Sequence, residues 1–347
     1  MKKFLFLAIA AAAMTSCSQD EVMEVAEKQA ISFGNVFVGK STRAAADNTY
    51  GAKKLIEKFN VYGTVTGTNG TVNIFNGNDV TKPGDLTEYN SSTAWTLEGP
   101  EQYWVEDADY AFAAVVNEEI ATVATTDTYG MPATLTYSTD NTGTKDLLYA
   151  TATVEKATTD QGIVAFTFDH LLSKVWFTVT SDTKYTETKN TDGTTTKSGY
   201  YYSVKNIKVT NFETGTYTIN GGTWAGTKAN NIEFGDVEQV TNTAEKTNAT
   251  QMLLIPNAAD FKITFDVELY VNGQHANTKS YESTVSNDLV KGHSYNFIIA
   301  LEQGNKPIKF SVASVNTWVE DLNNDQNTTN DAISLTFTEV TPTTPAN

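Results

Sequence analysis

The chain has 347 residues, and its 41 acidic and 24 basic residues give a formal net charge of −17 at pH 7. This acidity argues against binding to nucleic acid or to anionic lipid, because no excess of cations is present to neutralise phosphates. The length allows two domains. The only cysteine, Cys17, excludes an internal disulfide, a cysteine nucleophile and a thiolate metal site in the body of the protein.

Residues 1–16 predict a lipoprotein-type signal peptide. Lys2 and Lys3 precede an apolar run at 4–13, which is too short to span a bilayer as a stable helix. A small residue stands before Cys17, so cleavage there would leave this cysteine at the N-terminus with its thiol available for a lipid thioether. The alternative is an ordinary signal peptide with an incidental cysteine.

The following chain alternates apolar and polar residues with a period of two. Segments rich in β-branched and aromatic residues are 59–65, 133–137, 164–168, 175–179, 207–209, 261–267 and 295–299. Turn signals separate them, at 69–70, 192–193, 220–222 and 272–273. Many short strands at this spacing predict an all-β protein built of β-sandwiches. Helix is expected only as one short turn at 53–58.

A polar, turn-like stretch at 157–162 places a domain boundary near residue 160. We therefore expect an N-terminal β-sandwich over 44–160 and a C-terminal β-sandwich over 161–347. Residues 17–43 are interpreted as a propeptide.

Arg43 is the only arginine among the 24 basic residues, and the others are lysine. It lies in a stretch of small and polar residues, the kind of segment that proteases cut. An arginine-specific protease would have one site in the chain, the bond between Arg43 and Ala44. The alternative is a lysine-biased composition in which Arg43 has no special role.

Two segments at opposite ends of the chain share a pattern. Ala-Ile-Ser-Phe precedes Arg43 and places Ile31 and Phe33 on one face of a strand. The similar Ala-Ile-Ser-Leu begins the C-terminal segment 332–340.

This second segment places Ile333, Leu335 and Phe337 on one face. Removal of the first strand would leave a groove that the last strand of another copy could fill by strand addition. Alternatively, residues 332–340 pair within their own domain.

The sequence resembles the fimbrillins of the Bacteroidales, the FimA/Mfa-like major fimbrial subunits. The resemblance extends over most of the chain. It rests on the signal through Cys17, the arginine after the first strand, and the motifs at 168–175, 291–295 and 310–312 with Trp318.

This resemblance implies two transthyretin-like (Greek-key) β-sandwich domains in tandem. It implies a precursor lipidated at Cys17, with palmitate among its acyl chains, and anchored in the outer membrane. An arginine-specific extracellular protease would then cut between Arg43 and Ala44. Polymerisation would join copies of the chain and other fimbrial subunits by donor-strand exchange, and the fimbria would adhere to a host or bacterial surface ligand.

No cofactor or metal ion is expected. His170, His275 and His293 lack metal-ligand spacing and are interpreted as strand-end or turn residues. Residues 321–332 begin like a calcium loop but have Gln326 and Ala332 where that geometry needs glycine and glutamate, so only a loose surface calcium site stays open.

Three other functions remain alternatives. A non-polymerising surface lipoprotein could bind glycan or protein, with tryptophans as stacking platforms, although core packing is the favoured interpretation of Trp95, Trp104, Trp176, Trp224 and Trp318. An accessory, tip or anchor subunit of a fimbria could share the fold. An enzyme has no supporting motif.

Overall fold

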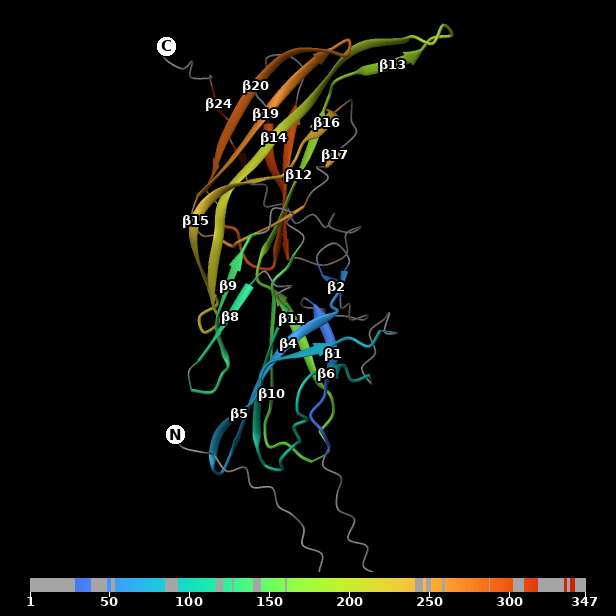
Figure 1. The fold of residues 1–347 in the computed structure, drawn as a ribbon. Helices are drawn as coiled ribbons and strands as arrows, with labels where there is room; N and C mark the ends of the chain where they lie inside the picture. The colour runs from blue at the N-terminus through green and yellow to red at the C-terminus, as the bar shows by residue number, and fades with distance from the viewer. Residues whose placement is uncertain are drawn as a thin grey trace, which may run out of the picture.

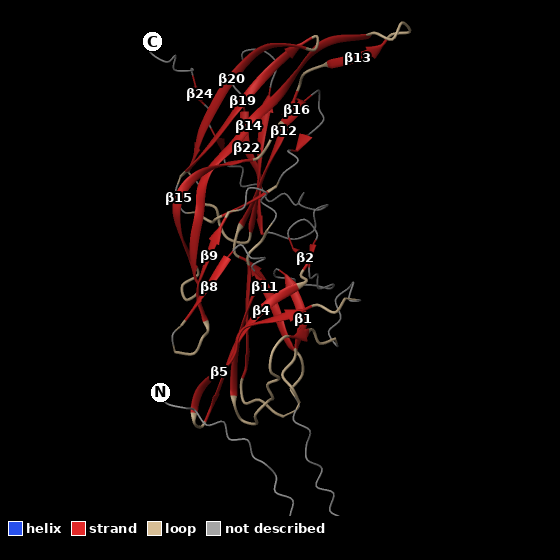
Figure 2. Ribbon diagram, in the orientation of Figure 1, coloured by secondary structure: helices blue, strands red, loops and turns tan. Residues whose placement is uncertain are grey.

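A computed structural model describes residues 29–38, 49–50, 54–84, 93–116, 121–126, 128–139, 145–159, 161–240, 246–247, 251–257, 260–286, 288–301, 309–317, 334–335 and 338–340. These residues form strands, turns and loops without any helix, so the all-β prediction is confirmed (Figure 2). Within them there is accordingly no helix long and apolar enough for a membrane span. The helical turn expected at 53–58 is wrong for its described residues, where buried Ile56 lies between two strands.

The N-terminal part of the chain builds a sheet with the strand order β1-β11-β10-β7-β4-β5-β6. Its strands are β1 (Phe33–Val38), β4 (Lys58–Gly67), β5 (Gly70–Thr81), β6 (Thr96–Leu97), β7 (Asp109–Val116), β10 (Leu148–Val154) and β11 (Val164–His170). Neighbours are antiparallel except for β1 and β11, which run parallel. Between β1 and β4 in the sequence, β2 (Thr49–Tyr50) and β3 (Lys54–Leu55) pair antiparallel as a separate two-stranded sheet.

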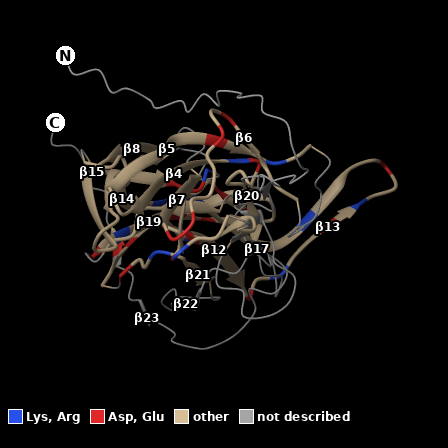
Figure 3. Cartoon of the chain, turned by 90° about the horizontal axis from the view of Figure 1, so that it is seen from below, with Lys and Arg blue, Asp and Glu red and all other residues tan. Residues whose placement is uncertain are grey.

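Two further sheets are built mainly, but not wholly, from the C-terminal part of the chain. The first contains β12 (Ser173–Ser181), β17 (Lys246–Thr247), β18 (Met252–Leu254), β21 (His293–Leu301), β22 (Lys309–Thr317) and β23 (Ser334–Leu335). The second contains β8 (Ala121–Thr125), β9 (Pro132–Ser138), β13 (Tyr185–Lys189), β14 (Thr195–Thr218), β15 (Thr223–Glu233), β16 (Val237–Val240), β19 (Phe261–Val271), β20 (Gln274–Val285) and β24 (Thr338–Val340). The long strand β14 runs through this sheet, and β13 projects from the body with it (Figures 1 and 3).

Three clusters of buried side chains hold these sheets together. One is centred on Phe33, Phe59, Phe112 and Phe166 of the N-terminal sheet. A second fills the sandwich between the two C-terminal sheets, from Val175, Phe177 and Phe297 to Val209 and Ile263. A third joins the two parts, with Tyr62 and Val115 packed in one cluster with Tyr137, Tyr217 and Ile255.

The third cluster explains why β7 is buried on both faces. Phe112 and Ala114 face the N-terminal cluster, whereas Ala113 and Val115 face the joining cluster. This follows from the alternation of side chains along a strand. A strand buried on both sides reads as a continuous apolar run rather than an alternating one.

Strands cross the expected boundary at residue 160 in both directions. β11 follows the boundary in sequence but pairs with β10, through Leu148 opposite His170, and with β1. β9 precedes the boundary but pairs with β14, through Thr136 opposite Thr216. The boundary near residue 160 and the tandem transthyretin-like arrangement therefore stay predictions.

Candidate functional site

The strand β1 ends its sheet beside β11, but the chain at and just before its start is hydrogen-bonded on both sides. On one side it runs parallel to β11, where the Val164 amide donates a 2.9 Å hydrogen bond to the Ser32 carbonyl. On the other side the Trp95 amide donates to the Phe33 carbonyl at 2.7 Å, and the Ile31 amide donates to the Gln102 carbonyl at 2.7 Å. The strand thus lies in a groove between β11 and residues 93–104.

Apolar side chains of β1 fill the floor of this groove. Ile31, Phe33 and Val36 are 3%, 0% and 1% exposed. The Phe33 ring centroid lies 5.3 Å from that of Phe75, 5.5 Å from that of Phe112 and 5.9 Å from that of Phe166. Burying each large apolar side chain is worth about 1.5–3 kcal/mol. Ile31 and Phe33 are thus both buried, and their removal with the first strand stays a prediction.

An irregularity in the middle of β1 changes which residues face inward. The register with β11 shifts between Gly34 and Val36, so an extra residue, Asn35, stands between two inward positions. The inward series is Ile31, Phe33 and Val36 rather than a strict alternation. Sequence reasoning missed this shift, although the Gly-Asn pair inside an apolar run is its signal.

Gly34 lies close to the wall of the groove that residues 93–104 form. A Cβ atom at this position would lie 2.7 Å from the Thr93 carbonyl oxygen and 3.1 Å from the Ile163 Cγ2 atom. The first distance is shorter than real Cβ contacts allow, and its partner is backbone. We call residues 93–95 the lip of the groove.

The C-terminal strand expected to act as a donor is docked on its own chain where the structure describes it. In β23, Leu335 pairs with Phe310 of β22. In β24, Val340 pairs with Ser280 of β20, and Glu339 forms a 3.0 Å ion pair with Lys279. These contacts agree with the alternative interpretation, that this segment pairs within its own domain.

Several predicted residues lie outside the described residues. These are Cys17, Arg43, Ala44, Ile333, Phe337, Trp318 and the calcium-loop-like segment 321–332. In the part of the chain that is described, no group of three or more His, Cys, Asp or Glu residues is placed to hold a metal ion.

The described tryptophans belong mainly to the core. Trp95, Trp104 and Trp176 are buried, and the half-buried Trp224 donates a 2.9 Å hydrogen bond from its ring nitrogen to the Leu171 carbonyl. This confirms the interpretation of these four as packing residues, and the rings of Trp95, Trp104 and Trp176 are too buried to stack on a glycan.

The predicted positions of the histidines are confirmed. His170 ends β11, His293 begins β21 and His275 lies at the start of β20. Sequence reasoning did not foresee that His170 is buried with its Nδ1 atom 2.5 Å from the Oδ2 atom of buried Asp146. Asp146 also accepts a 2.8 Å hydrogen bond from the Leu147 amide, so the loop just before β10 is tied to the end of β11 through His170.

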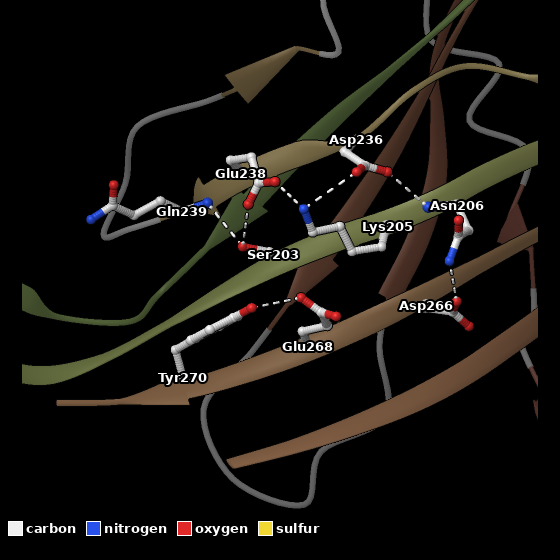
Figure 4. Close-up of polar contacts among 9 residues, drawn as sticks. All are labelled: Ser203, Lys205, Asn206, Asp236, Glu238, Gln239, Asp266, Glu268 and Tyr270. Atoms are coloured by element: carbon white, nitrogen blue, oxygen red, sulfur yellow. Dashed lines mark hydrogen bonds and ion pairs between the residues drawn. The ribbon is translucent and has the colours of Figure 1, made fainter. Parts of the chain in front are cut away.

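A second polar cluster lies on the C-terminal sheet, around Lys205 of β14 (Figure 4). Its ammonium group contacts Glu238 and lies 3.3 Å from Asp236, while Ser203 donates a hydrogen bond to Glu238. Partial burial acts to lower the pKa of Lys205, but the hydrogen bonds with Glu238 and Asp236 outweigh it and raise that pKa. Because its charges are paired, this cluster is interpreted as a link between β14 and β16.

Comparison with known proteins identifies the fold and the family. The sequence matches the fimbrillin-like family over residues 42–318, which is most of the chain. The chain belongs to this family. No curated protein matches it significantly.

Solved structures agree with this assignment at the level of the fold. A fimbrial protein from Bacteroides vulgatus aligns with a TM-score of 0.55 at 13% identity, covering 83% of this chain and 99% of its own. A Bacteroides uniformis protein, provisionally described as a cell adhesion protein, has a TM-score of 0.47 at 19% identity, with coverages of 84% and 98%. The fimbrial anchor protein Mfa2 from Porphyromonas gingivalis has a TM-score of 0.40 at 12% identity, with coverages of 83% and 97%. Only the first of the three likenesses is close enough to support the shared fold.

The resemblance stated from the sequence is therefore confirmed. Membership of the fimbrillin-like family supports a fimbrial subunit or adhesin, a structural protein rather than an enzyme. It also implies a location at the cell surface and interaction with other fimbrial subunits.

Proposed function

We propose that this fimbrillin-like chain is a structural subunit of a cell-surface fimbria, matured by cleavage after Arg43 and polymerised by donor-strand exchange. The precursor is anchored to the outer membrane through lipid on Cys17. Cleavage separates residues 1–43, which include β1, from the rest of the chain. The C-terminal strand of another copy then occupies the vacated groove.

The observation that supports this proposal best is the position of β1 in its groove. Residues 29–33 are hydrogen-bonded on both sides, and Ile31 belongs to the core with Phe33 and Val36 of β1. Removal of this segment would uncover Phe75, Phe112 and Phe166 and leave backbone groups without partners on both sides. Exposed strand edges beside an apolar groove recruit another strand.

The C-terminal strand is a suitable replacement by composition. Ile333, Leu335 and Phe337 offer three large apolar side chains, as do Ile31, Phe33 and Val36. Each burial is worth about 1.5–3 kcal/mol, and each ladder hydrogen bond adds about 0.5–1.5 kcal/mol net. Where the structure describes this segment, it forms the short strands β23 and β24 on its own chain, and these pairings would have to break before the segment is donated.

A second candidate function rests on the pairing of β23 and β24 with strands of their own chain. If β23 and β24 stay paired with β22 and β20, the chain keeps its C-terminal strand and does not donate it. It would then be an accessory, tip or anchor subunit, or a surface lipoprotein that binds glycan or protein without polymerising.

N-terminal sequencing of the protein from cell-surface material, with unboiled and boiled samples on a denaturing gel, separates these functions. The proposal expects an N-terminus at Ala44 and a ladder that collapses on boiling. A lipid-blocked Cys17 with a single monomer band would instead establish the anchored, non-polymerising alternative.

A further inference from the structure

We propose that Gly34 and the lip form a steric filter that distinguishes the resident strand β1 from an incoming strand. This inference rests on the proposed function, because it concerns which strands the groove accepts. It identifies Gly34 on the resident strand and Thr336 on the incoming strand as the residues that determine specificity.

The lip closes on β1 because residue 34 has no side chain. The Trp95 amide of the lip bonds the Phe33 carbonyl at 2.7 Å, and the Thr93 carbonyl lies where a Cβ of residue 34 would be, at 2.7 Å from it. Any side chain at position 34 must push the Thr93 backbone away, which strains the neighbouring hydrogen bond of Trp95. Overpacking of this kind is destabilising.

The C-terminal strand does not carry glycine at the matching position. When Ala332-Ile333-Ser334-Leu335 is placed on Ala30-Ile31-Ser32-Phe33, Thr336 falls on Gly34. Its Cβ would meet the Thr93 carbonyl, so this strand can use the register of β1 only with the lip displaced. The groove therefore fits its own first strand better than the strand that replaces it.

Because of this mismatch, cleavage changes which of the two strands can occupy the groove. While β1 is covalently attached, it occupies the groove with the lip closed and excludes the C-terminal strands of other copies. Once cleavage detaches β1, its advantage of being part of the same chain disappears and replacement becomes possible. The filter thus prevents polymerisation before maturation.

The first test uses the uncleaved chain and does not depend on polymerisation. Gly34→Ala should speed hydrogen exchange of the Trp95 amide about tenfold or more, because the lip opens. Gly67→Ala is the matched control, since a Cβ there meets nothing within 4 Å. Equal protection of Trp95 in both variants would overturn the filter.

The second test measures binding of labelled peptides with the sequence of residues 332–340 to the chain cleaved after Arg43. The filter predicts that a peptide with Thr336→Gly binds about tenfold more tightly than the natural peptide. Thr338→Gly, which falls on Val36 in this register, controls for the loss of strand propensity and should weaken binding.

The two tests keep the filter and the proposed function distinguishable. If Thr336→Gly weakens binding as much as Thr338→Gly, the filter is overturned while strand acceptance stands. If none of the peptides binds, strand acceptance fails, and hydrogen exchange at Trp95 still decides whether the lip excludes a side chain at position 34.

Discussion

The two ends of the chain carry nearly the same strand pattern, yet the structure holds them in different ways. The chain at and just before the start of β1 is hydrogen-bonded on both sides, and Phe33 lies among three other phenylalanine rings. In the C-terminal segment, by contrast, β24 lies along β20 with Glu339 and Val340 exposed.

This difference shows that strand pattern alone does not determine how firmly a strand is held. Ile31, Phe33 and Val36 are buried in and just before β1, whereas the described contacts of the C-terminal segment are few and its ion pair is exposed to solvent. This contrast is what the proposed exchange of strands after cleavage would require.

The largest expected effect follows from removing the single arginine. Arg43→Lys should abolish cleavage by an arginine-specific protease and leave the surface protein without heat-sensitive polymers. The gel and N-terminal sequencing measure both outcomes. The control adds Lys40→Arg to the same variant, which restores one arginine to the segment and should restore maturation. Polymers formed by Arg43→Lys alone would contradict release of β1 as the trigger.

The next largest effect is expected on the stability that the packing of Phe33 in β1 contributes. Phe33→Ala should lower the free energy of unfolding of the uncleaved chain by about 3–5 kcal/mol, because it leaves a cavity among packed rings. Chemical denaturation measures this change. Val105→Ala, at a side chain that is 56% exposed, is the control and should change stability by less than about 0.5 kcal/mol. Similar losses in both variants would show that β1 is not part of the folded core.

A smaller effect is expected at the C-terminal segment. Lys279→Ala removes the ion pair with Glu339, and we expect polymerisation of the cleaved chain to become about two- to fivefold faster, since exposed pairs are weak. Light scattering after cleavage measures the rate. Lys208→Ala removes a 2.9 Å ion pair between β14 and β15 and should leave the rate unchanged.

The ion pair also gives a pH dependence with a definite sign. The hydrogen bond with Glu339 raises the pKa of Lys279. Its contribution is therefore fully present below the unfolded pKa of about 10.4 and is lost as pH rises through the folded value. The rates of the wild type and of Lys279→Ala should therefore converge only once the pH exceeds the raised pKa of Lys279. A rate difference that persists there would assign the effect to packing instead.

The smallest effect tests the cluster that joins the two parts of the molecule. Burial, with a smaller contribution from Tyr217, raises the pKa of Tyr149 from 10.0 to about 12. Because the neutral form is favoured in the folded state, stability is lost between about pH 10 and 12. Tyr149→Phe should reduce that alkaline loss by an amount on the order of 1 kcal/mol, with allowance for partial exposure. Alkaline unfolding followed by tyrosine absorbance measures it, and Tyr129→Phe at an exposed site is the control.

Much of the fold was predictable because strand formation depends on local alternation. The segments 164–168 and 261–267, for example, alternate strictly and are strands β11 and β19. The turn at Asn272 and Gly273 was predictable because both residues adopt positive φ, which asparagine and glycine tolerate.

Pairing across the chain was less predictable. Nothing near Val164 shows that β11 joins strands before residue 160, and nothing near Leu135 shows that β9 joins β14. These partners are far apart in sequence, so their contacts depend on the packing of whole sheets. The short strand at Lys54 was missed because a segment so short has no clear period.

The sequence by itself determined the all-β class, the family, the alternation of small and large side chains at 30–33, and the position of the single arginine. Only the tertiary structure decided that the start of β1 is hydrogen-bonded on both sides, that Gly34 lies close to Thr93, and that β24 docks on β20. The physical reason is that alternation and composition act through neighbours in the chain. A groove, by contrast, is formed by residues such as Thr93 and Val164, which approach β1 only after the sheets have packed.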